Sequence, residues 1–91
     1  MKSILMDKEY GCLVCGSPYV EEHHVFYGTA DRRLSNKYGL TVYLCAKCHR
    51  GSTGVHFNLE LDRALKRMAQ KKFEELYSHD EFMRLFMRSY L

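Results

Sequence analysis

Two stretches in the first half of the chain have the composition of β-strands. Residues 19–27, YVEEHHVFY, and residues 40–45, LTVYLC, are rich in β-branched and aromatic side chains, which favour extended backbone. The polar and glycine-containing residues 28–39, GTADRRLSNKYG, predict a loop between the strands, and the glycines and hydroxyl residues within 49–58 predict that part of that stretch is a loop or a frayed turn. The pattern therefore predicts two strands joined by a loop.

The last third of the chain changes to helical periodicity. From residue 59 the apolar positions largely recur every three or four residues, at Leu61, Leu65, Met68, Phe73 and Leu76. Asn58 is a good N-cap, and Glu60 and Asp62 favour the positive end of the helix dipole. The pattern breaks near Ser78, and a shorter helix follows. Its apolar face consists of Phe82, Leu85, Phe86 and Tyr90, which we expect in a core or a dimer interface.

Length and composition fit one small globular domain, residues 1–91. The chain is 46% hydrophobic and 27% charged, as folded proteins are, and a core of this size often needs a staple. We find no apolar run of membrane-spanning length and no signal-peptide pattern in MKSILMDKEY. We therefore expect a cytoplasmic protein with no membrane partner, in which disulfides are uncommon.

Four cysteines form two C-x2-C pairs, Cys12 with Cys15 and Cys45 with Cys48. In a reducing compartment two such pairs indicate a tetrahedral structural zinc site; redox chemistry or buried thiols are the alternatives. Gly16 suits a tight turn with positive φ, and we expect a similar role for the glycine at position 51. The pairs are 29 residues apart, more than the roughly 15–20 of a compact zinc ribbon, so zinc would clamp the base of a hairpin that contains both predicted strands.

Two adjacent histidines, His23 and His24, lie in the first predicted strand. Neighbours on a strand point to opposite faces, so one imidazole can hold a metal ion while the other accepts a proton from water, as phosphodiester hydrolysis requires. His49 directly follows the second cysteine pair, which would fix its position. A divalent-metal site at His23 and His49, completed by His56 or Asn58, is geometrically reasonable. The alternative for any single histidine is an ordinary surface or hydrogen-bonded role.

The order C-x2-C, EHH, LCAKCH and a later histidine over residues 12–58 resembles the zinc-stabilised HNH endonucleases, also called ββα-metal or His-Me finger nucleases. The runs YGLTVYLCAKCHRG and VHFN are similar to those of small phage nucleases linked to recombination. The resemblance implies an α+β fold, a small ββα-metal (HNH) finger with a four-cysteine zinc site at 12–58 and C-terminal helices at 59–91. It also implies a bacterial or phage-infected host.

The resemblance assigns roles to individual residues. His24 is expected to be the general base. His23 and His49, with His56, are expected to bind a catalytic Mg²⁺ or Mn²⁺ ion, while the four cysteines hold a separate structural zinc. The products of DNA cleavage would carry 5′-phosphate and 3′-hydroxyl ends.

The chain departs from the family pattern at two positions. The family asparagine comes five residues before the second cysteine pair and braces the loop that presents the base, but Leu40 stands there. Asn36 or Asn58 could substitute for it. The fourth residue after the histidine of the second cysteine pair, a common ligand position, is Thr53, so His56 would take that role.

The net charge of +3 is unevenly distributed. Residues 28–50 hold five basic residues and one acidic residue, whereas residues 1–27 hold two basic and four acidic residues. This basic segment predicts a polyanion partner, with Arg32, Arg33 and Lys37 contacting phosphates without reading bases.

Three functions are compatible with these features. The leading hypothesis is a metal-dependent DNA endonuclease, with a recombination or replication protein as a candidate targeting partner. A non-catalytic zinc module that binds nucleic acid explains the cysteines and the charge but not the four clustered histidines. An interaction protein that dimerises through its C-terminal helices, with a degenerate site, is the third hypothesis.

Overall fold

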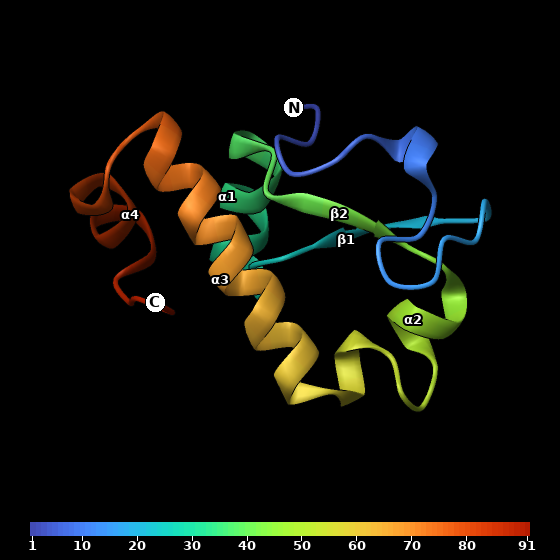
Figure 1. Ribbon diagram of the computed structural model, residues 1–91. Coiled ribbons are helices and arrows are strands. Elements are labelled where there is room, and N and C mark those ends of the chain that lie inside the picture. Colours follow the sequence, from blue (N-terminus) through green and yellow to red (C-terminus); the bar gives the residue numbers. More distant parts are fainter.

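The computed structural model describes all residues, 1–91, as an α+β fold with four α-helices and one two-stranded antiparallel sheet (Figure 1). The elements are, in order, η1 (Lys8–Tyr10), β1 (Glu21–His24), α1 (Thr29–Tyr38), β2 (Thr41–Leu44), α2 (Ala46–Arg50), η2 (Val55–Phe57), α3 (Leu59–Leu76) and α4 (His79–Phe86). None of the helices has both the length and the apolar character needed to cross a membrane.

The two predicted strands form and pair with each other, but both are shorter than predicted. His23 lies opposite Val42, and His24 lies opposite Thr41. Beyond the strand, the backbone N–H of Val25 still donates to the carbonyl of Leu40 over 3.0 Å. The alternation of strand side chains buries His23 and leaves His24 only half-buried, so the two imidazoles have different surroundings.

The predicted loop at 28–39 is wrong, because most of this segment forms helix α1. Its glycines stand at the ends of the helix: Gly28 precedes it, and Gly39, with φ of 69°, ends it in the left-handed conformation. Inside the helix, the hydroxyl of the fully buried Ser35 donates to the carbonyl of Phe26 (2.7 Å) and accepts from its N–H (3.0 Å). This tertiary contact holds α1 against the segment after β1, so a helix and not a hairpin loop joins the strands.

The C-terminal helices begin and break where the sequence predicts. The Asn58 side chain caps α3 by accepting from the N–H of Leu61 (3.1 Å), and the Ser78 side chain caps α4 by accepting from the N–H of Glu81 (3.0 Å). Tyr90, which we predicted on the second helix, lies beyond it, because α4 ends in the left-handed conformation of Met87.

One hydrophobic core of thirteen buried residues joins the first half of the chain to the C-terminal helices. Phe26, Phe73 and Phe82 are its largest fully buried side chains, and burial of each contributes about 1.5–3 kcal/mol. Phe26 follows β1, and its ring contacts that of Phe82 on α4 at a centroid distance of 5.6 Å. Figure 1 shows α3 running from η2 towards α4. Phe73 on α3 packs against the same Phe82 ring. The core therefore fixes α3 relative to β1, the strand that carries the histidines.

Candidate metal centres and active site

The sulfur atoms of Cys12, Cys15, Cys45 and Cys48 lie within 4.8 Å of one another. All four cysteines are free. The sulfurs of Cys15 and Cys45 are 3.5 Å apart, too far for a disulfide but close to the about 3.8 Å that separates two thiolates on a tetrahedral zinc ion. The cluster is therefore compatible with a structural metal ion such as zinc.

Each cysteine pair forms a turn that directs a backbone N–H at a sulfur atom. The N–H of Cys15 donates to the sulfur of Cys12 (3.5 Å), and the N–H of Cys48 donates to the sulfur of Cys45 (3.4 Å). Gly16 has the positive φ, 80°, that its position predicts. The glycine at position 51 has a φ of −70°, so the expected left-handed turn is wrong there. A Cβ atom at that glycine would lie 2.4 Å from a backbone carbonyl oxygen, which explains why a side chain is excluded.

The neighbouring thiols oppose the ionisation of Cys48. Burial, together with the three neighbouring thiols, raises the pKa of Cys48 to about 12. Burial also raises the pKa of Cys12, but backbone N–H groups outweigh it and lower that pKa to about 6. Four thiolates at this spacing need a cation between them, because the repulsion is otherwise uncompensated. The donor set thus fits a thiophilic ion.

A second cluster consists of His23 on β1, His49 on α2 and His56 on η2. Their ring nitrogens lie within 4.8 Å of one another, and the ring centroids are 4.8–5.3 Å apart. The structure thus brings together all three histidines that we predicted as ligands of one ion. Imidazole donors suit transition ions such as Ni²⁺, Fe²⁺ and Zn²⁺ better than Mg²⁺.

The Nε2 atom of His23 is buried and has no hydrogen-bond partner. The residue is 3% exposed, and leaving such an atom unsatisfied costs about 1–3 kcal/mol. Burial, followed by repulsion from His49 and His56, lowers the pKa of His23 to about 4, so the imidazole is neutral at pH 7 and its free nitrogen can donate to a metal ion. This unpartnered atom is the strongest indication that the histidine cluster holds a ligand.

Glu21 orients His49 from the other side of its ring. Glu21 and His23 are two residues apart on β1 and therefore lie on the same face of the strand, and the Nδ1 atom of His49 lies 2.7 Å from Oε1 of Glu21. Arg50 binds the same carboxylate through two nitrogens, at 2.9 and 2.5 Å, and the hydrogen bonds from Arg50 and His49 lower the pKa of Glu21 to about 2. An ionised carboxylate only accepts, so Nδ1 of His49 donates and its Nε2 is left free for the cluster. Our sequence analysis missed Glu21, although its two-residue spacing from His23 was a usable signal.

His24 lies at the boundary between two hollows. One is lined by His23, His49 and His56 together with Tyr27, Glu22, Arg32 and His24 itself. The other is lined by Glu22, His24, Thr29, Arg32, Arg33 and Asn36. The predicted base therefore faces both the histidine cluster and the basic side of α1.

The remaining predicted residues are distributed unevenly around His24. Arg32 and Arg33 line its hollow, whereas Lys37 lies outside both hollows with its ammonium 5.4 Å from the centre of the Tyr38 ring. Leu40, at the position of the family asparagine, is fully buried in the core. Of the two asparagines that could substitute for it, Asn36 lines a hollow with His24, and the other caps α3.

The chain matches no protein-family model, no curated protein and no solved structure.

Proposed function

We propose that this protein is a metal-dependent DNA endonuclease of the HNH type that cuts or nicks phosphodiester bonds. The observation that supports it best is the buried, unpartnered Nε2 of His23 beside His49 and His56, with His24 on the adjacent open side. A purely structural histidine cluster would leave that nitrogen unsatisfied.

Each group of residues has a separate role in the proposed reaction. His23, His49 and His56 would hold the divalent ion, which when bound would neutralise charge on the phosphate and the leaving oxygen. His24 would accept the proton of the attacking water. Arg32 and Arg33 would bind flanking phosphates and so keep the scissile bond in place. The cysteine cluster would hold zinc and thereby position α2, which carries His49.

The test is cleavage of supercoiled plasmid with Mn²⁺, Mg²⁺ or Ni²⁺ by the wild type and by His24→Ala. We expect nicked or linear products from the wild type and a rate at least about 100-fold lower for the variant, since general base catalysis typically contributes that much. His24→Ala should retain its affinity for Mn²⁺, whereas His23→Ala and His49→Ala should lose affinity and activity together.

His79→Ala is the matched control, because His79 is an exposed histidine on α4 that pairs with Glu74. This variant should cut like the wild type. If wild-type protein binds DNA but cuts with none of these ions, the protein is a non-catalytic zinc module that binds nucleic acid.

A further inference from the structure

Two exposed aromatic residues neighbour the same candidate metal ligand, His56: Tyr27 in space and Phe57 along the chain. The ring of Tyr27 is 6.1 Å from that of His56 and 6.2 Å from that of His23, between centroids. Phe57 directly follows His56 in η2. Tyr27 is 46% exposed and Phe57 is 72% exposed, so neither ring contributes much to the core. Single exposed aromatic residues are common, but two that neighbour one candidate metal ligand indicate a binding role.

Lys66 holds the ring of Tyr27 in place. Its ammonium lies 4.5 Å from the centre of that ring and 3.0 Å from the carboxylate of Asp62. Both charged side chains are largely buried, at 13% and 7% exposure. A cation over one face of a tyrosine is a stabilising contact, and it leaves a rigid, partly exposed ring at the wall of the histidine hollow.

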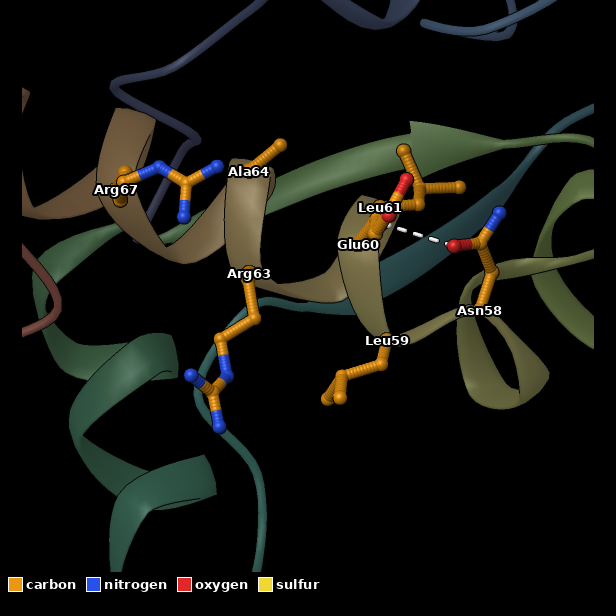
Figure 2. Close-up of a pocket in the computed structure, with 7 residues that line it drawn as sticks. All are labelled: Asn58, Leu59, Glu60, Leu61, Arg63, Ala64 and Arg67. Atoms are coloured by element: carbon orange, nitrogen blue, oxygen red, sulfur yellow. Dashed lines mark hydrogen bonds between the residues drawn. The ribbon is translucent and has the colours of Figure 1, made fainter.

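A shallow hollow that carries positive charge lies on the first turns of α3, the helix that follows η2 and its Phe57 in the chain. It is lined by Asn58, Leu59, Glu60, Leu61, Arg63, Ala64 and Arg67 (Figure 2). Leu59 and Arg63 project from the same side of the helix in Figure 2, and Leu59 is 66% exposed. Seven ion pairs occur in the structure, and neither Arg63 nor Arg67 belongs to any of them. Two unpaired guanidinium groups therefore outnumber the single carboxylate of Glu60.

Aromatic faces beside unpaired arginines match the chemistry of nucleic acid whose bases are unpaired. Proteins bind single strands through stacking of bases on aromatic side chains and through basic grooves that follow the backbone. In a duplex the base faces are already stacked on one another, so exposed rings would have no partner.

We propose that the substrate strand is unpaired at the site, with its bases stacked on Tyr27 and Phe57 and its backbone bound by Arg63 and Arg67. The inference rests on the proposed function in one respect, that the scissile phosphate lies at the histidine cluster. It defines the substrate class as single-stranded DNA or duplex DNA that is locally melted, as in a bubble or a fork.

The test is binding of fluorescein-labelled oligonucleotides of one sequence, as a single strand, a bubble and a full duplex, measured by anisotropy at one salt concentration. All proteins carry His24→Ala, so that cleavage does not interfere. The single strand and the bubble should bind more tightly than the duplex. Tyr27→Leu and Phe57→Leu should each weaken single-strand binding about tenfold, the typical effect of one lost stacking contact. Tyr27→Phe should bind like its parent, because it keeps the ring.

The matched control is Tyr19→Leu, since Tyr19 is an exposed tyrosine (83%) that lines neither histidine-bearing hollow. Melting followed by circular dichroism checks that each variant folds. Duplex binding as tight as single-strand binding, or unchanged binding by both leucine variants, would overturn the inference. Single-strand preference in a wild-type protein that never cuts DNA would leave the stacking of unpaired bases on Tyr27 and Phe57 standing and overturn the nuclease proposal, so the two failures are distinguishable.

Discussion

The Nδ1 atom of His49 donates to Oε1 of Glu21 over 2.7 Å, and this bond decides which nitrogen of His49 faces the histidine cluster. Because Arg50 holds the same carboxylate through two nitrogens, Glu21 cannot easily turn away. A histidine ligand that is braced in this way by a carboxylate is oriented before the metal arrives.

Loss of that brace should lower metal affinity. We expect Glu21→Ala to bind Mn²⁺ about 10-fold to 100-fold more weakly than the wild type, as typically follows the loss of such a partner. Glu21→Gln keeps an acceptor oxygen and should bind with intermediate affinity. Isothermal titration calorimetry measures both, with the exposed Glu75→Gln as control. Equal affinities for all four proteins would show that Glu21 does not orient His49.

Acid should destabilise the protein through His23. Burial lowers the pKa of His23 from 6.5 to about 4, so below pH 6.5 the unfolded chain takes up a proton that the folded chain does not. Folding stability must therefore fall as the pH drops from about 6.5 towards 4. Urea unfolding at pH 7 and pH 5, without added divalent ions, measures the effect. His23→Gln lacks the titrating group and should lose less stability over this range; an equal loss would mean that other groups are responsible.

The cysteine cluster should hold about one zinc ion per chain, as a four-thiolate site does. Metal content can be measured by elemental analysis of the purified protein. Cys45→Ser should unfold or aggregate, because a core this small depends on its staple and the metal's binding energy is available only to the folded chain. A folded, metal-free Cys45→Ser protein would contradict the zinc assignment.

The arginines of α1 should contribute to DNA binding through phosphates. Replacing Arg32 and Arg33 together with alanine should make the slope of log affinity against log salt shallower by about one to two units, for two lost phosphate contacts. Fluorescence anisotropy over a range of salt concentrations measures the slope. The control replaces Lys71 and Lys72, an adjacent basic pair on α3 that lies outside the histidine hollows. An unchanged slope for the arginine pair would show that these side chains do not contact phosphates.

The sequence by itself determined the features that depend on residues close together in the chain. The two C-x2-C pairs predicted a four-cysteine cluster because each pair forms its own turn. Asn58 predicted the start of α3, since a capping side chain acts on N–H groups three residues away, and the break in the apolar pattern near Ser78 predicted the division between α3 and α4. Alternation along β1 predicted different faces for His23 and His24, because side chains of a strand point alternately to its two sides.

Only the tertiary structure decided how distant segments meet. Helix α1 exists although its sequence resembles a loop, because the contact between Ser35 and Phe26 anchors it to the segment after β1. His56, and not Asn58, joins His23 and His49, and Glu21 meets His49 across 28 positions of the chain. Such contacts depend on how α2 and η2 pack against β1. The periodicity of apolar residues within one element predicts the type of that element, but not which other element it packs against.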